Sequence, residues 1–150
     1  MTATATVRLR HLANWANLST PLGLLVARAG SARVRRGPEA LYLADHYRFG
    51  FPVADAFTVG DVVISKHDLD QLQARCPQLL QHETAHSRQW MWCLGMPFVP
   101  LYVAAMGWSW VRTGDRAARN VFECRAGLAQ GGYADVPTRR LRLSASGRAR

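Results

Sequence analysis

The segment from His82 to His86 reads His-Glu-Thr-Ala-His, with three residues between the two histidines and a glutamate directly after the first. On an α-helix, residues four apart lie on one face about one turn apart, so both imidazoles can reach a single metal ion. Neutral imidazole is a preferred ligand of zinc. Glu83 projects about 100° further around the helix axis, beside the ion, where its carboxylate can accept a proton from water. The spacing therefore predicts a Zn²⁺ ion held by His82 and His86, with Glu83 as general base.

A zinc site needs at least one more protein ligand, and Glu123 is the preferred candidate. It is one of only three glutamates in the chain. A later helix that returns antiparallel across the first would bring its carboxylate to the histidines. Cys93 lies about 10.5 Å along the helix axis from His86, and Cys124 points about 100° away from Glu123, so neither thiol suits the same ion. Other possible donors, in or near loops, are His46, His67 and Asp115.

The sequence on both sides of the motif supports a helix. Leucines recur at helical spacing from residue 68 onward. Pro77 suits the first turn of a helix, whereas Gly95 and Pro97 are typical of a helix end. We therefore expect the motif to lie on a helix that ends near residue 94.

Short strands and further helices are expected around this central helix. Two stretches rich in β-branched and aromatic residues predict a small antiparallel sheet. Apolar residues at helical spacing predict three more helical regions, the last of which carries the third ligand. The predicted strands are 41–43 and 56–65, the predicted helices are 7–29, 100–111 and 116–130, and the basic stretch 31–38 is predicted to be a loop. The sequence thus predicts an α+β fold.

Length and composition fit one compact unit, because the chain has 150 residues and 49% of them are apolar. Nineteen basic and ten acidic residues give a net charge of +9. All ten acids lie between 39 and 135 with eight basic residues, so this segment carries a net charge of −2. The excess positive charge belongs to the two ends. We therefore divide the chain into a basic helical segment (1–37), a core (38–135) and a basic, disordered tail (136–150).

The cysteine content argues against a disulfide scaffold and against a four-cysteine zinc ribbon, because the chain has three cysteines and no close pair. A cytoplasmic location follows as the expectation. The arginine-rich ends suit an anionic surface, but no aromatic residues interleave the tail. Nucleic acid is therefore not the expected partner.

The stretch 90–111 contains 22 residues without a charge. Gly95, Pro97 and Pro100 interrupt it, so the part beyond Pro97 would form roughly 21 Å of helix, against a hydrocarbon core of about 30 Å. A membrane span is therefore not expected. The preferred interpretation is a buried helix of the core; the alternative is peripheral membrane contact through 90–111, with tryptophans at the interface.

Four short segments in and around the motif region carry one resemblance. They are Ala-Phe-Thr-Val-Gly (56–60), Val-Val-Ile-Ser (62–65), Leu-Leu-Gln before His82, and Glu-Cys-Arg-Ala (123–126). In this respect the sequence resembles the gluzincin metallopeptidases, especially the prenyl-protease and heat-shock-protease type and the small minimal gluzincins. The resemblance covers about 56–127, roughly half of the chain.

The resemblance implies a zincin-like catalytic core and a zinc metalloendopeptidase that cleaves a peptide or protein substrate. It implies zinc ligation by His82, His86 and Glu123, with Glu83 as general base. Tyr133 is a candidate to stabilise the oxyanion. An extended peptide would pair with an edge strand formed by Val62, Val63, Ile64 and Ser65.

The sequence departs from the family pattern at one position. Many of these enzymes have an aspartate four residues after the ligand glutamate, which orients a ligating histidine, and here that position is Gly127. Either Asp115 or Asn120 would have to replace it, or zinc would bind more weakly. The alternative function, suggested by the basic ends of the chain, is a catalytically inactive, zinc-bearing module that binds peptide, nucleic acid or an anionic membrane surface.

Overall fold

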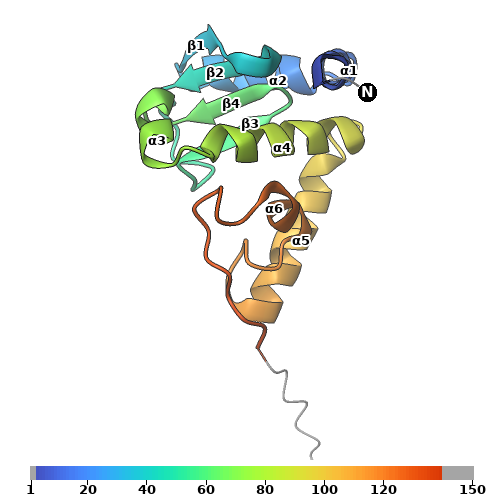
Figure 1. The fold of residues 1–150 in the computed structure, drawn as a ribbon, viewed down its shortest axis with the longest axis vertical. Helices are drawn as coiled ribbons and strands as arrows, with labels where there is room; N and C mark the ends of the chain where they lie inside the picture. The colour runs from blue at the N-terminus through green and yellow to red at the C-terminus, as the bar shows by residue number, and fades with distance from the viewer. Residues whose placement is uncertain (1–2, 140–150) are drawn as a thin grey trace, which may run out of the picture.

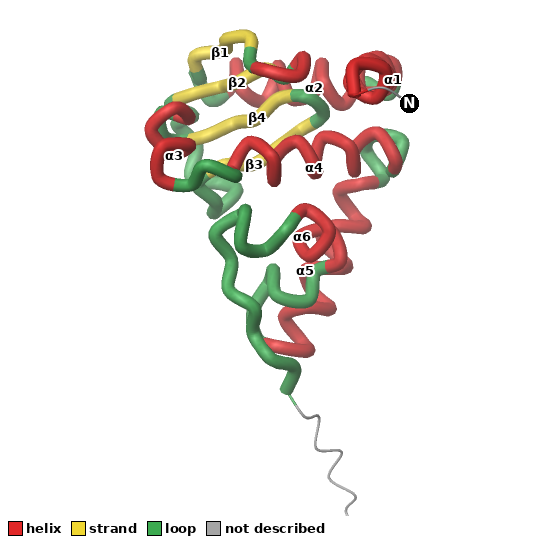
Figure 2. Tube along the Cα trace, in the orientation of Figure 1, coloured by secondary structure: helices red, strands yellow, loops and turns green. Residues whose placement is uncertain are grey.

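The structure of the chain is a computed structural model that describes residues 3–139 (Figures 1 and 2). It confirms an α+β fold, with one four-stranded sheet and six α-helices in the described part. Of the tail predicted to be disordered, 136–139 form no helix or strand and the remainder lies outside the described residues. The elements are α1 (Ala3–Ala16), α2 (Ser19–Ala29), β1 (Arg33–Arg36), the 3₁₀ helix η1 (Pro38–Ala40), β2 (Tyr42–Asp45), β3 (Ala56–Val59), β4 (Val62–Ser65), α3 (Leu69–Arg75), α4 (Leu79–Trp92), α5 (Phe98–Thr113) and α6 (Val121–Ala126).

The sheet is mixed, which corrects the predicted antiparallel arrangement. Its strand order is β1-β2-β4-β3, with β1–β2 and β3–β4 antiparallel and β2–β4 parallel. After β2 the chain passes to the far edge as β3, then turns at Gly60, whose φ is 61°, and returns as β4 between the two. This return makes β4 parallel to β2.

The prediction that Val62–Ser65 is the edge strand for a peptide is wrong. These residues form β4, which is paired on both sides, so its backbone groups are already used in the sheet. All four of its residues are buried, as expected for a central strand covered on both faces. The free edge beside α4 belongs to β3.

Helices cover both faces of the sheet (Figure 1). On one face, Ala27 of α2 packs with Val62 and Ile64 in an apolar cluster. On the other, Val63 packs with Leu69 of α3 and Leu79 of α4. Alternate residues of β4 thus contact opposite layers, and the sheet fixes where α4 begins.

Two boundaries differ from the sequence prediction. The basic stretch predicted as a loop contains β1, all of whose residues are exposed, so no alternation of burial marked it. The boundary proposed after residue 37 falls between the paired strands β1 and β2. The last helix is only Val121–Ala126, because the Asn120 side chain caps its start and Gly127, with φ 97°, ends it.

A buried polar network around Asp61 joins α1, the β3–β4 turn and α4. One oxygen of the fully buried Asp61 carboxylate accepts hydrogen bonds from Asn14 Nδ2 (2.8 Å) and Ser87 Oγ (2.7 Å). The other oxygen lies 2.8 Å from His11 Nδ1, and Arg10 Nε lies 3.2 Å from the first. Because Ser87 directly follows the motif, this network holds the motif helix against the rest of the fold.

The helix α5 extends away from the sheet and from α4, with the short α6 beside it (Figure 1). The helix α5 has 16 residues. No helix among residues 3–139 is both long and apolar enough to cross a bilayer.

Candidate metal centre

Two helices bring His82, His86 and Glu123 together in the interior. The histidines lie on α4 and the glutamate on α6, and all three are buried. The two imidazole Nε2 atoms are 3.0 Å apart. Glu123 Oε2 lies 3.3 Å from His82 Nε2, and Glu123 Oε1 lies 3.5 Å from His86 Nε2. One donor atom from each residue can therefore reach a common point, which makes this cluster a candidate metal site.

The tautomer of His82 is fixed by the backbone of Gly127. His82 Nδ1 lies 2.9 Å from the Gly127 carbonyl oxygen. A carbonyl can only accept, so Nδ1 carries the hydrogen and donates it. In the neutral ring, Nε2 then presents a lone pair toward Glu123 and His86, as a metal ligand must.

Gln89 fixes the tautomer of His86 in the same way. Its amide nitrogen Nε2 donates to the Phe122 carbonyl at 2.9 Å, which settles the orientation of the amide. Its oxygen Oε1 therefore faces His86 Nδ1, at 2.8 Å, and accepts a hydrogen bond from it. The second imidazole thus also directs a lone pair into the cluster.

A positive charge between these lone pairs and the Glu123 carboxylate would stabilise the cluster, and either a proton on one imidazole or a metal cation can supply it. Glu123 Oε2 is buried and accepts no hydrogen bond within the described residues, while Oε1 accepts one from the Tyr102 hydroxyl of α5. Burial alone would raise the pKa of Glu123, but a hydrogen bond from a histidine that carries a proton on Nε2, together with the Tyr102 hydroxyl, outweighs it and keeps the pKa below its ordinary value. The carboxylate therefore stays ionised, and a bound cation would satisfy the atom left without a donor.

Glu83 lies on α4 outside the three-residue cluster. It is buried, and its Oε2 accepts a hydrogen bond from Thr58 Oγ1 at 2.6 Å. Thr58 belongs to β3, and its carbonyl accepts a hydrogen bond from Trp90 Nε1 at 2.9 Å. Glu83 is thus anchored to the edge strand, and its carboxylate is free of the ligand role.

The segment after α6 closes over His82. A Cβ added at Gly131 would lie 2.5 Å from His82 Cε1 and 2.7 Å from its Nε2, so the backbone of Gly131 packs directly on the imidazole. The Tyr133 ring lies 6.0 Å from the His82 ring and is partly exposed. Burial, with the nearby carboxylates of Glu123 and Glu83, raises the pKa of Tyr133, so its hydroxyl stays protonated and can donate.

The two residues that were predicted to orient a histidine make other contacts in the structure. Asp115 caps a turn by accepting from the backbone N–H groups of Ala117 and Ala118, and Asn120 caps α6, so neither orients a histidine. A backbone carbonyl and Gln89 do so instead. The other donors considered also have different contacts: Cys124 Sγ donates to the Ala118 carbonyl and His67 faces Asp55.

Sequence reasoning missed four contributors to the centre. Gln89, three residues after His86, could have been found from its helical spacing. Tyr102, Gly131 and the Gly127 carbonyl carry no local signal, because their contacts depend on how α4, α5 and α6 pack.

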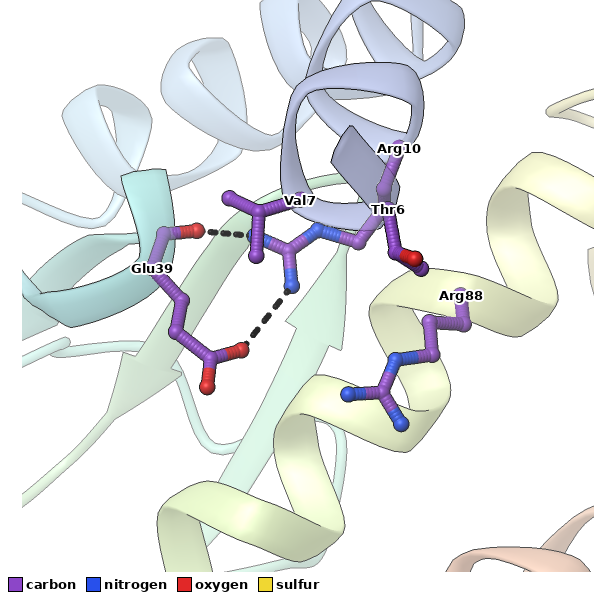
Figure 3. Close-up of a pocket in the computed structure, with 5 residues that line it drawn as sticks. All are labelled: Thr6, Val7, Arg10, Glu39 and Arg88. Atoms are coloured by element: carbon purple, nitrogen blue, oxygen red, sulfur yellow. Dashed lines mark hydrogen bonds and ion pairs between the residues drawn. The ribbon is translucent and has the colours of Figure 1, made fainter. Parts of the chain in front are cut away.

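A surface pocket of about 310 Å³ lies elsewhere, between α1, η1 and α4 (Figure 3). Its wall includes the side chain of Arg10, which donates to the Glu39 carbonyl and lies 3.8 Å from the Glu39 carboxylate. Arg88 lines it from α4, about 200° around the axis from His86. This pocket therefore surrounds a structural ion pair and is separate from the metal cluster.

No protein-family model, curated protein or solved structure matches this chain.

Proposed function

We propose that the chain is a zinc-dependent metallopeptidase with a zincin-like core, which hydrolyses peptide bonds. One observation carries the proposal: two imidazole lone pairs and a buried carboxylate converge on one point, with a second, non-ligating carboxylate on the same helix. Two histidines and a glutamate are a known ligand set of catalytic zinc. The motif therefore has both the ligands and the base that such a reaction requires.

The kinds of donor atom favour zinc. Zinc bonds to nitrogen and oxygen are about 2.0–2.2 Å long, so a tetrahedral ion separates its ligand atoms by roughly 3.4 Å. The two imidazole Nε2 atoms are 3.0 Å apart, and different oxygens of the Glu123 carboxylate lie 3.3 Å from His82 Nε2 and 3.5 Å from His86 Nε2, so the cluster is compact enough for such an ion. Calcium or magnesium would prefer a set made of oxygen ligands.

Zinc bound at this cluster would act as a Lewis acid on the peptide carbonyl and on the attacking water. Glu83 accepts the proton of that water and passes it to the leaving amine. The Thr58 hydroxyl orients the Glu83 carboxylate, because its donated hydrogen bond occupies one carboxylate oxygen and leaves the other for the proton. The Tyr133 hydroxyl, kept protonated by its raised pKa, donates to the oxyanion.

In this proposal an extended substrate pairs with β3, since β3 is the sheet edge beside α4. The Glu83 carboxylate accepts a hydrogen bond from Thr58 of the same strand, so β3 would position both the substrate and the base.

Metal content and hydrolysis, measured on the same variants, test the proposal. We expect about one zinc per chain by elemental analysis, with a large loss in His86→Ala and Glu123→Ala. Glu83→Gln should keep its zinc but hydrolyse a peptide library about 10² to 10⁴ times more slowly. His67→Ala is the matched control, because this exposed histidine lies outside the cluster and should change neither quantity.

The outcomes separate three conclusions. Absence of zinc, or zinc retained in full by Glu123→Ala, would refute the assignment of the ligands. Unchanged hydrolysis in Glu83→Gln would refute the assignment of the base. Bound zinc without hydrolysis of any peptide would show a zinc-bearing binding module instead.

A further inference from the structure

The solvent-facing side of α5 is apolar over most of its circumference. Only one strip of the helix faces the protein, and it contains Phe98, Tyr102, Ser109 and Thr113. At 100° per residue, the remaining positions cover an arc of about 200°. None of the side chains in this arc is charged or carries a hydroxyl or amide group: Val99, Pro100, Leu101, Val103, Ala104, Gly107, Trp108, Trp110 and Val111.

This distribution of side chains is the opposite of that expected for a helix whose free side faces water. A helix on a protein surface normally turns charged and polar residues toward the solvent. Here the large apolar side chains of the arc are between 41% and 61% exposed. Exposed apolar patches of more than a few hundred Å² mark interaction sites. The prediction that 90–111 is a buried helix is therefore wrong for α5, and the arc needs an apolar environment.

The breadth of the arc indicates lipid and not another protein. A helix that docks into a protein groove, or onto a second copy, buries one stripe at i, i+3, i+4 and i+7 and keeps the rest polar. A helix that is apolar on every side not covered by protein is stable in an apolar solvent that contacts all of those sides. The hydrocarbon boundary of a membrane is such a solvent.

Charge at one end of α5 specifies the kind of membrane. The Arg112 guanidinium lies 5.5 Å from the Trp108 ring centre, in the last turn. Arg139 donates its backbone N–H to the Arg112 carbonyl, and its guanidinium lies against Gly114 at the C-cap of α5. Exposed Arg116 lies two residues after Gly114, and the carboxylate of Asp115 between them accepts hydrogen bonds from the backbone of Ala117 and Ala118. Tryptophan and arginine together are the residues that anchor proteins at the headgroups of anionic lipids.

We propose that α5 inserts into the interface of an anionic membrane, with Trp108 and Trp110 at the boundary between headgroups and acyl chains and the nearby arginines at the phosphates. Its 16 residues give about 24 Å of helix, less than the hydrocarbon thickness of about 30 Å, so it lies in the interface and does not span it. The helix extends away from the sheet (Figures 1 and 2), and the large apolar side chains of its free arc are exposed. This inference does not depend on peptidase activity.

Vesicle flotation with the full chain tests the inference. The probes are vesicles of phosphatidylcholine alone and of phosphatidylcholine mixed with phosphatidylglycerol. Each arginine near an anionic surface strengthens binding by about fivefold, so we expect at least a tenfold preference for the mixed vesicles. Brominated lipids should quench the tryptophan fluorescence.

The double variant Trp108→Ser/Trp110→Ser should bind at least tenfold more weakly, because it removes two large apolar side chains from the membrane contact. Leu25→Ser, on the exposed face of α2, is the matched control and should bind like the wild type. Far-ultraviolet circular dichroism checks that both variants fold.

Three outcomes would overturn the inference. The first is a wild-type chain that remains in the lipid-free bottom fraction at all lipid compositions. The second is undiminished binding by a folded Trp108→Ser/Trp110→Ser protein, which would assign the binding to the basic ends alone. The third is that light scattering shows a dimer for the wild type and a monomer for the double variant, while neither protein binds vesicles. The arc would then be covered by a second copy of the chain.

Discussion

Gly131→Ala is the most direct way to disturb the proposed metal centre without replacing one of its proposed ligands. Its φ lies outside the left-handed range, so alanine suits the backbone. The obstacle is His82, because the added Cβ would lie 2.5, 2.7 and 2.9 Å from three atoms of the imidazole. These contacts fall short of an ordinary contact of about 3.4 Å by about 0.5 to 0.9 Å, so the ring, or the segment above it, must move by up to about 0.9 Å.

A displacement of that size is larger than a metal centre tolerates. Functional constellations must be held within about 0.5 Å of their working geometry. Changes to groups that position a ligand typically cost 10- to 100-fold in metal affinity. We therefore expect Gly131→Ala to weaken zinc binding by 10- to 100-fold, or about 1.4 to 2.8 kcal/mol.

The same change should appear in thermal unfolding. With zinc at 100 times the wild-type Kd, binding stabilises the wild type by about 2.7 kcal/mol and the variant by about 0.4 to 1.4 kcal/mol. At about 2–4 °C per kcal/mol, the zinc-dependent rise in Tm should be smaller by about 3 to 9 °C. In excess chelator, any remaining difference in Tm measures the metal-independent cost of packing the added methyl group against His82.

Competition with a fluorescent zinc chelator measures the affinity, and Gly107→Ala is the matched control. Gly107 lies on α5 with nothing within 4 Å of its added Cβ, so this change should leave zinc affinity unaltered. Wild-type affinity in Gly131→Ala would refute the reasoning, because it would mean that the packing of Gly131 on His82 does not constrain the site.

Three further predictions address the surroundings of the centre. Gln89→Leu removes the acceptor that holds His86, so zinc affinity should fall 10- to 100-fold, whereas Gln81→Leu, at an exposed position of α4 outside the cluster, should leave it unchanged, both by chelator competition. Tyr102→Phe removes a hydrogen bond to the buried Glu123 carboxylate, so urea unfolding in chelator should show a loss of about 1.5–3 kcal/mol, while Tyr133→Phe, whose hydroxyl donates no hydrogen bond within residues 3–139, should show little change. Asp61→Asn leaves the buried Arg10 charge without its closest partner and should cost about 3–5 kcal/mol in urea unfolding; the exposed pair at Asp55 offers the control, since Asp55→Asn should cost less than about 1 kcal/mol.

The parts of the fold that could be predicted depend on local pattern. Helical spacing predicted that His82 and His86 share a face, and the structure also brings Glu123 to them. The order of the strands could not be predicted in this way. The insertion of β4 between β2 and β3 is decided by which strands pair over long range, and an apolar run such as Val62–Ser65 reads the same at an edge or in the centre.

Competition between short-range signals explains other differences. Residues 116–130 have enough apolar spacing for a long helix, but Asn120 bonds to the backbone of Phe122 and starts the helix late. Tyr102 was unpredictable for a different reason. Its contact with Glu123 joins two helices whose packing angle no sequence pattern specifies.

The contribution of the Gly127 carbonyl cannot be measured by substituting side chains. This carbonyl orients His82 through the main chain, so alanine scanning could remove every side chain nearby and never delete that interaction. Replacing Leu128 by its α-hydroxy acid analogue would convert the Gly127 carbonyl into a weaker ester acceptor. Backbone chemistry, through semisynthesis, is therefore the tool that can weigh this interaction. A search pattern that demands an aspartate here would also overlook chains that solve the same problem with a peptide bond.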